Sequence, residues 1–280
     1  MTGQVKRMGL VLSGGGAKGA YQAGVFQAME EAGLCPWVEA ISGCSIGAMN
    51  ALLFATGDPA LWRQAWEESD FGAMGGGGVT PARMEMLALQ ATQAGGLERY
   101  LQGEWLLPLD PLRQLARQVA SPEKLALGRP RVSVCAYQLE AEEPRYFWLE
   151  GRPLDQVVEL AAASSALPVA FPPVEFQGKH YCDGGATPPY CGKNNADKVP
   201  LAPLAGLGLD VILVVYLTGR DRVDRGLLPP GTRLLELYPS QPLEPAPSAG
   251  TMDFSRPHIR WRRELGLEDG RRFLKEQLGV

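Results

Sequence analysis

The sequence predicts an α/β fold with three layers, α/β/α, around a mostly parallel central sheet. Two units of apolar strand, glycine-rich turn and helix follow one another near the start of the chain, and a later strand ends at Asp183-Gly184-Gly185. Such units are typical of parallel sheets, because parallel strands need a crossover connection that is usually a helix.

The first unit begins with the apolar run Met8–Ser13, which ends at three glycines. Apolar residues at helical spacing follow over residues 17–32, and Gly33 is a typical helix stop. The second unit has a strand at 38–42, a turn at 43–47 and an apolar helix at 48–55. In both units, the pattern predicts a buried strand that is followed, after a short turn, by a helix.

The remaining elements follow from the same periodicities. Further helices are expected at residues 59–68, 81–93, 111–119 and 154–163, and strands at 131–137, 145–149, 174–182, 210–217 and 232–238. The tail is expected to form two helices, with Ser255 as N-cap and Gly266 between them. Prolines and glycines interrupt the apolar stretch 199–217, which predicts a helix and a buried strand, because a membrane span needs about 20 uninterrupted apolar residues.

Composition narrows the function classes. The 280 residues are 45% hydrophobic and 21% charged, as in globular proteins, and are expected to form a single domain, 1–280. The motifs fall within residues 8–217, and residues 250–280 form the helical tail. A net charge of −4 argues against nucleic-acid binding. Five cysteines without a C-x-x-C pair suggest reduced thiols in a cytoplasmic protein, without a zinc or redox signature.

The strongest chemical motif is Gly43-Cys44-Ser45-Ile46-Gly47. A serine between two glycines, after a strand and before a helix, matches the nucleophile elbow, in which a strained turn exposes the hydroxyl. The start of the helix also favours developing negative charge. The alternative is a serine that only caps the helix.

The glycine loop Gly14-Gly15-Gly16-Ala17-Lys18-Gly19 has several interpretations. A P-loop is excluded, because Gly19 stands where a serine or threonine is required. The spacing matches the dinucleotide fingerprint, with Glu39 as the acidic partner. The loop could also supply an oxyanion hole from consecutive backbone N–H groups, or be a tight turn only.

Asp183-Gly184-Gly185 follows a strand, and alone it could be a turn. In a parallel sheet, however, the carboxyl ends of the strands meet at one edge. The glycine loop, Ser45 and Asp183 all follow such ends, so we expect them to converge.

In this order, the GGGAKG loop, the GCSIG elbow and the DGG motif resemble the patatin-like phospholipase family. The stretches 163–168 and 171–173, and residues 253–255 in the tail, are similar to it as well. The resemblance implies a serine–aspartate dyad, with Ser45 as nucleophile and Asp183 as base. Lys18 stands where the family has arginine or lysine. The residues expected to support the site are the oxyanion donors Gly14, Gly15 and Gly16 and the motif positions Gly19, Gly43, Gly47, Gly184 and Gly185.

The expected activity is hydrolysis of the acyl esters of phospholipids or other lipids through an acyl-serine, without metal or cofactor. An acyltransferase that uses the same acyl-enzyme, and a non-enzymatic nucleotide- or lipid-binding module, are the alternatives. The segment 187–198 looks longer than the family's usual link after DGG and could change substrate choice.

Two regions could place the protein against a membrane surface as a peripheral contact. Residues 71–109 combine a glycine run with apolar residues and could form a lid, or a helix packed on the sheet. The tail arginines could touch anionic lipids, although a solvated helix face is the commoner explanation. These arginines are Arg256, Arg260, Arg262, Arg263, Arg271 and Arg272.

A dyad leaves no role for the two histidines. His180 is expected to be a partly exposed strand residue, and His258 would supply the order Ser–Asp–His of α/β-hydrolases. Cys44 and Cys182 each precede a candidate catalytic residue, and the alternation of side chains along a strand predicts that both point away from the chemistry.

Overall fold

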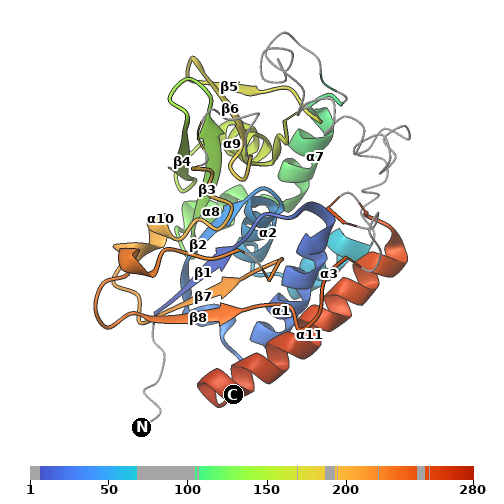
Figure 1. Ribbon diagram of the computed structural model, residues 1–280, viewed down its shortest axis with the longest axis vertical. Helices are drawn as coiled ribbons and strands as arrows, with labels where there is room; N and C mark the ends of the chain where they lie inside the picture. Colours follow the sequence, from blue (N-terminus) through green and yellow to red (C-terminus); the bar gives the residue numbers. More distant parts are fainter. Residues whose placement is uncertain are drawn as a thin grey trace.

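The computed structural model describes residues 7–67, 105, 107–168, 170–186, 193, 195–219, 221–244, 250–251 and 253–280. Its centre is an eight-stranded sheet in the order β5-β6-β3-β2-β1-β7-β8, with β4 paired to β3. Helices flank this sheet (Figure 1). The predicted α/β fold is therefore confirmed.

The sheet has a parallel part and an antiparallel part. β1, β2, β7, β8 and the first half of β3 run parallel, whereas β4, β5 and β6 are antiparallel to their neighbours. The strands are β1 (Met8–Leu12), β2 (Val38–Cys44), β3 (Arg131–Gln138), β4 (Glu143–Trp148), β5 (Val174–Phe176), β6 (Lys179–Asp183), β7 (Val211–Val215) and β8 (Arg233–Leu237).

The helices follow the predicted positions over most of the described chain. They are α1 (Ala20–Glu31), α2 (Ile46–Ala55), α3 (Pro59–Glu67), α7 (Asp110–Val119), α8 (Pro122–Ala126), α9 (Leu154–Ser165), α10 (Ala202–Ala205) and α11 (Arg256–Leu278). A 3-10 turn, η1 (Gly16–Gly19), leads from β1 into α1. The helix expected at 81–93 and the glycine run before it lie outside the described residues.

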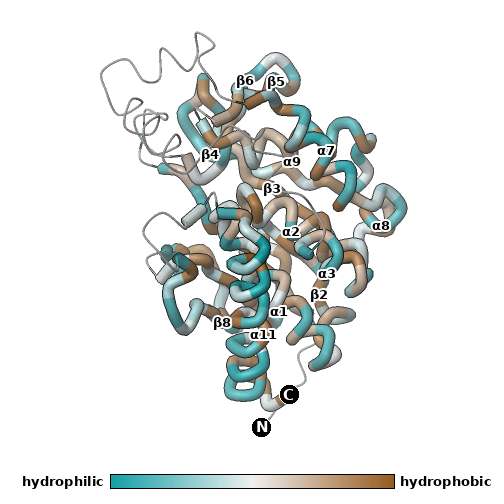
Figure 2. Tube along the Cα trace, turned by 90° about the vertical axis from the view of Figure 1, so that its right-hand side faces the viewer, coloured by the Kyte–Doolittle hydropathy of each residue, from teal (hydrophilic) through white to brown (hydrophobic). Residues whose placement is uncertain are grey.

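The side chains of β1 alternate between two hydrophobic clusters, one on each face of the sheet. Leu10 and Leu12 belong to the main core, which α1, α2, α7, α9 and α11 cover. Val11 points to the opposite face, where Val214, Tyr216 and the short α10 form a smaller cluster. In Figure 2 the tube of α11 is largely hydrophilic, whereas α2, in the interior, is white to brown. Every residue of α2 is buried, which fixes the elbow that precedes it.

Two element predictions were wrong. The single strand expected at 174–182 is the hairpin β5–β6, because Gln177 (φ 52°) and Gly178 (φ 70°) both take the left-handed conformation of a tight hairpin turn. The two tail helices are one helix, α11, because Gly266 packs against α1 instead of ending the helix. A Cβ atom at Gly266 would lie 2.0 Å from the carbonyl oxygen of Tyr21.

The arginines of the tail differ in their surroundings, and four of the six are exposed, as expected for a solvated helix face: Arg256, Arg260, Arg271 and Arg272. Arg262 is fully buried and donates hydrogen bonds to the carbonyls of Leu243 and Asp253, so it holds the segment before α11. Arg263, Arg271 and Arg272 pair with the acidic residues Glu67, Glu31 and Asp269. Over the described parts of the chain, no helix has the length and apolar character needed to cross a membrane.

Candidate functional site

Strand β3 brings the elbow and Asp183 together. On one edge of β3, Cys44 at the end of β2 lies opposite Cys135, and Asp183 at the end of β6 lies opposite the next residue, Ala136. β4 occupies the other edge along this stretch, so β6 takes the place of β2 where β2 ends. The residue after Cys44, Ser45, is therefore placed beside Asp183, as the sequence predicted.

Ser45 has the strained backbone of a nucleophile elbow. Its φ of 56° and ψ of −128° are uncommon for a residue with a side chain, and it is the N-cap residue of α2 without a capping bond from its hydroxyl. The flanking glycines are required by space. A Cβ atom at Gly43 would lie 2.2 Å from the carbonyl oxygen of Gly47, and one at Gly47 would lie 2.2 Å from that of Leu12. The Ser45 hydroxyl therefore does not cap the helix, which was the alternative to a role as nucleophile.

Asp183 is buried, and the Ser45 hydroxyl is its neighbour. The Ser45 side chain acts on the Asp183 carboxylate as a hydrogen-bonding group, and the N–H of Gly185 donates to its Oδ1 atom at 2.8 Å. Burial raises the pKa of Asp183 above its ordinary value, although these hydrogen bonds and the charge of Lys198 lower it in part. The result is a carboxylate of increased basicity in contact with a serine hydroxyl.

The prediction that Cys44 points away from the site was wrong. Its Sγ atom lies 3.8 Å from Oδ1 of Asp183 and donates to it. The alternation of a strand does not continue into Ser45, because Ser45 turns the chain with a positive φ. Cys182 follows the prediction, since it packs with Tyr137 and Ala186 in a separate small cluster.

The glycine loop passes directly beside the serine. A Cβ atom at Gly14 would lie 3.1 Å from that of Ser45, and one at Gly19 would lie 2.5 Å from the side chain of Ile46. Gly16 (φ 56°) leaves no room for a side chain, because a Cβ atom there would lie 2.2 Å from the carbonyl oxygen of Thr251. The loop and the elbow are therefore in contact.

The backbone N–H groups of this loop divide into two sets. Gly14 donates to the carbonyl oxygen of Lys198 at 3.0 Å, and Ala17 donates to that of Thr251 at 2.8 Å. The N–H groups of Gly15 and Gly16 have no acceptor among the residues that the structure describes. This narrows the expected oxyanion donors from three to two.

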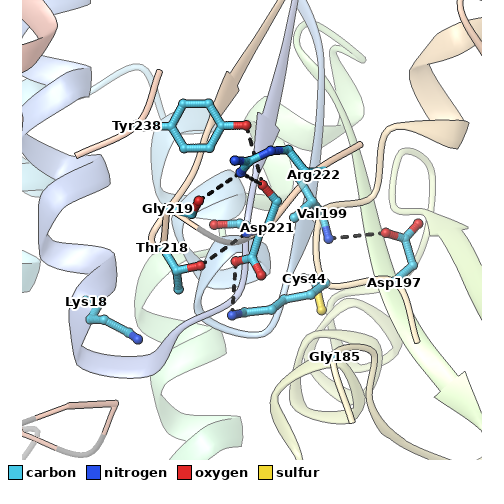
Figure 3. Close-up of polar contacts among 12 residues, drawn as sticks. Lys18, Cys44, Gly185, Asp197, Val199, Thr218, Gly219, Asp221, Arg222 and Tyr238 are labelled. Carbon is cyan, nitrogen blue, oxygen red and sulfur yellow. Dashed lines mark hydrogen bonds and ion pairs between the residues drawn. The ribbon is translucent and has the colours of Figure 1, made fainter. Parts of the chain in front are cut away.

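Two lysines flank the loop. Lys18 is buried, and its Nζ atom pairs with Glu244 at 2.8 Å. Lys198, which the sequence analysis did not single out, pairs with Asp221 at 3.1 Å. Figure 3 shows Asp221 between Lys18, on the left, and Cys44 and Gly185, on the right. Gly184 completes the turn after Asp183, where a Cβ atom would lie 2.7 Å from the carbonyl oxygen of Cys135.

Neither histidine contacts the dyad residues. His180 is half-exposed and its Nδ1 atom contacts Glu140, as expected for a strand residue. The Nδ1 atom of His258 contacts both Asp253 and Ser255 near the start of α11. Because both partners use the same ring nitrogen, this group does not have the geometry of a catalytic triad.

The dinucleotide interpretation lacks its acidic partner. Glu39 lies near the amino end of β2, next to Met8 in the sheet register, whereas the glycine loop follows the carboxyl end of β1. The Glu39 carboxylate pairs instead with Arg7 at 2.9 Å. Within the described segments, no group of three His, Cys, Asp or Glu side chains could hold a metal ion.

Two expectations fall mostly outside the described residues. The first is the lid or packed helix expected at 71–109, of which the structure describes only residues 105 and 107–109. Among these, Trp105 is exposed, and Leu107 and Leu109 are buried. The longer link expected at 187–198 is described only at residue 193 and from residue 195 onward.

Comparisons of sequence point to one family. The patatin-like phospholipase family model matches residues 10–192. An uncharacterized NTE family protein of Mycobacterium tuberculosis is 29% identical over 215 residues, which cover 77% of this chain and 50% of that protein. A lysophospholipase of Aspergillus terreus is 52% identical over 50 residues, which cover 18% of this chain and 3% of that enzyme. The chain thus spans half or less of the length of these relatives.

The fold comparison agrees with the sequence. The crystal structure of VipD from Legionella pneumophila superposes with a TM-score of 0.53 at 17% identity, covering 97% of this chain and 67% of VipD. This likeness concerns the fold alone. Since the family match extends over most of the chain and includes the glycine loop, the elbow and Asp183, the chain belongs to the patatin-like phospholipase family of lipid hydrolases.

Proposed function

We propose that this chain cleaves the carboxylic esters of phospholipids or other acyl lipids through a dyad of Ser45 and Asp183 and an acyl-serine intermediate. The observation that carries the proposal is the placement of Ser45 beside the buried Asp183 carboxylate, on which its hydroxyl acts as a hydrogen-bonding group. A serine is a weak nucleophile until a neighbouring base takes its proton. Asp183 is the base in reach.

In the first step, Asp183 accepts the hydroxyl proton while the Ser45 oxygen attacks the ester carbonyl carbon. The negative charge that develops on the carbonyl oxygen is stabilised by the N–H groups of Gly15 and Gly16 and by the start of α2. The tetrahedral intermediate collapses, and Asp183 returns the proton to the leaving alcohol. Ser45 then carries the acyl group.

In the second step, Asp183 takes a proton from a water molecule that attacks the acyl-serine. The new tetrahedral intermediate releases the fatty acid, and the proton returns to Ser45. The raised pKa of Asp183 supports this role, because a base is most effective when its pKa approaches the working pH. We also propose that residues 1–280 form a single domain and that this domain is the catalytic unit.

Labelling with a fluorophosphonate tests this proposal together with a panel of p-nitrophenyl esters. We expect one covalent adduct, on Ser45, and loss of ester hydrolysis in Ser45→Ala. Ser240→Ala is the matched control, because Ser240 is an exposed serine far from the elbow in the sequence. An adduct on another residue, or full activity of Ser45→Ala, would overturn the assignment of the nucleophile.

Product analysis with an added alcohol acceptor separates hydrolysis from acyl transfer. Free fatty acid as the main product supports the hydrolase, whereas an acylated acceptor supports the transferase. If no ester is consumed and no adduct forms, the binding-module alternative gains support.

A further inference from the structure

The side chain of Lys198 lies between the two loops that carry the proposed chemistry. Its Cγ atom would be 3.4 Å from a Cβ atom on Gly14 and 3.2 Å from one on Gly185. Its carbonyl oxygen accepts the Gly14 N–H, and its charge acts on the Asp183 carboxylate. Lys198 therefore places a cation beside the site at which the ester would be attacked.

The side chain of Lys198 remains partly accessible in its ion pair. Its ammonium lies 3.1 Å from Oδ2 of Asp221, and the two side chains are 34% and 20% exposed. Ion pairs that keep this access to water contribute little free energy, so an incoming anion can compete with the carboxylate.

Asp221 is held in place by its backbone. Its N–H donates to Oγ1 of Thr218, and its carbonyl oxygen accepts from Arg222 and Tyr238. Figure 3 shows these contacts around Asp221. Because Asp221 is fixed and Lys198 has a long flexible stem, Lys198 is the partner that can turn to a ligand.

The other lysine at the loop is not placed for this role. The Lys18 side chain is only 6% exposed, and its Cε atom would lie 3.5 Å from a Cβ atom on Gly15. It therefore supports the loop from within, whereas the side chain of Lys198 is partly exposed.

We propose that Lys198 and Asp221 form a headgroup site, in which the Lys198 ammonium binds the phosphate of a glycerophospholipid and Asp221 holds that ammonium when no substrate is present. The inference rests on the proposed ester hydrolysis at Ser45. In such a lipid, the phosphate and the acyl ester are attached to the same glycerol, so a cation beside the nucleophile lies within reach of the phosphate. Ammonium–phosphate hydrogen bonds are stronger than neutral ones.

A phosphate-binding Lys198 would change which lipids the enzyme prefers as substrates. A neutral glyceride offers no anion to replace Asp221, so it leaves the ion pair intact. A lysophospholipid replaces one anionic partner of Lys198 by another and gains a contact that the glyceride lacks. The enzyme should therefore favour esters that carry a phosphate.

The test compares kcat/KM for palmitoyl-lysophosphatidylcholine with kcat/KM for monopalmitoylglycerol. In Lys198→Met, which keeps the stem and removes the charge, we expect the ratio of the two values to fall by about ten-fold. Lys198→Arg should retain most of the ratio, and Asp221→Asn should raise it, because the competing carboxylate is gone. Lys275→Met, an exposed lysine of α11, is the control for the loss of one positive charge.

Inhibition of monopalmitoylglycerol hydrolysis by inorganic phosphate identifies the source of the anion. Inhibition that Lys198→Met abolishes shows that phosphate alone is bound, whereas a changed ratio without inhibition shows that the whole headgroup is needed. An unchanged ratio in Lys198→Met, or a ratio that falls in Asp221→Asn as well, overturns the inference. Failure of the wild-type chain to hydrolyse either lipid, with no fluorophosphonate adduct on Ser45, instead overturns the proposed function.

Discussion

The backbone N–H of Ser45 donates a 3.0 Å hydrogen bond to the hydroxyl oxygen of Ser164, a fully buried residue of α9. Ser164 in turn donates to the carbonyl oxygen of Cys135 at 2.6 Å. The strained turn at Ser45 is thus tied to β3, the strand that also positions Asp183. Ser164 therefore supports the geometry of the proposed dyad from a fully buried position.

Ser164→Ala should lower both stability and activity. The change leaves the Ser45 N–H without this acceptor, and an unsatisfied buried polar group costs about 1–3 kcal/mol. We expect a lower free energy of unfolding and, because misplaced reacting groups slow chemistry strongly, a kcat at least about ten-fold lower. Urea unfolding and steady-state kinetics measure the two effects.

Ser165→Ala is the matched control for this change. The Ser165 hydroxyl is buried and has no hydrogen-bond partner within the described residues, so its removal should leave both measurements close to wild type. If the two variants behave alike, the hydrogen bond to Ser45 has no special role.

Asp183→Asn should be inactive and folded. Asparagine keeps the size and much of the hydrogen bonding, but it cannot take the proton of Ser45. We expect kcat to fall at least about 10²-fold, the low end of the contribution of a general base. Because Asp183 also accepts from Gly185, the thermal midpoint must be measured beside the rate. An active Asp183→Asn enzyme would require another base for Ser45.

The pH dependence of kcat/KM should show an acid limb that belongs to Asp183. Protonation of the carboxylate removes the base, so the rate should rise with pH as Asp183 ionises. Burial raises the pKa of this group, which places the midpoint above the ordinary value of 3.8. A profile that stays flat down to pH values below 3.8, in a protein that remains folded, would argue against Asp183 as the base.

The sequence predicted those parts of the site in which backbone conformation and spacing carry the signal. The elbow at Ser45 and the glycine loop both need residues without side chains, and such needs are visible as glycine at fixed positions. The rule that strand ends meet at one edge accounts for the contact between the glycine loop and the elbow, because β1 and β2 are parallel. Asp183 joins them for another reason: β6 is antiparallel to β3, and its end meets the end of β2 from the opposite direction. Observed distances agree with that convergence.

Other features depend on contacts between distant segments. Nothing local in the run 174–182 marks Gln177 and Gly178 as a turn, since a strand can include a glycine. Ser164 stood out only as part of a stretch similar to the family, because its partners are Ser45, in the turn after β2, and Cys135 of β3. In the sequence, Lys198 is one charged residue in a polar link, and its position beside Gly14 depends on the fold.

The contact between α1 and α11 provides a test of the fold. In Gly266→Ala the new Cβ atom would lie 2.0 Å from the carbonyl oxygen of Tyr21, which belongs to the helix backbone and cannot turn aside. Overpacking of this kind costs about 1–3 kcal/mol, so the urea midpoint should fall.

Gly206→Ala is the control for the loss of a glycine. A Cβ atom at Gly206 meets nothing within 4 Å, and its φ of −92° suits any residue. Its stability should be unchanged or up to about 1 kcal/mol higher, because alanine restricts the unfolded chain. A Gly266→Ala variant as stable as wild type would show that α11 is not packed closely on α1.

The thiol of Cys44 is expected to tune the base. Its pKa lies well above the ordinary value, through a hydrogen bond with Cys135, burial and the nearby Asp183, so it remains a protonated donor at neutral pH. Its hydrogen bond lowers the pKa of Asp183. Removing the donor in Cys44→Ala should therefore raise the pKa of Asp183 and move the acid limb of kcat/KM to higher pH, whereas Cys44→Ser, which keeps a donor, should move it less.

Cys182→Ala is the control for this change. It removes a buried thiol that packs away from the carboxylate oxygens of Asp183, and should leave the acid limb in place. If Cys44→Ala changes the plateau rate but not the position of the limb, Cys44 fills space beside Asp183 and does not set its basicity.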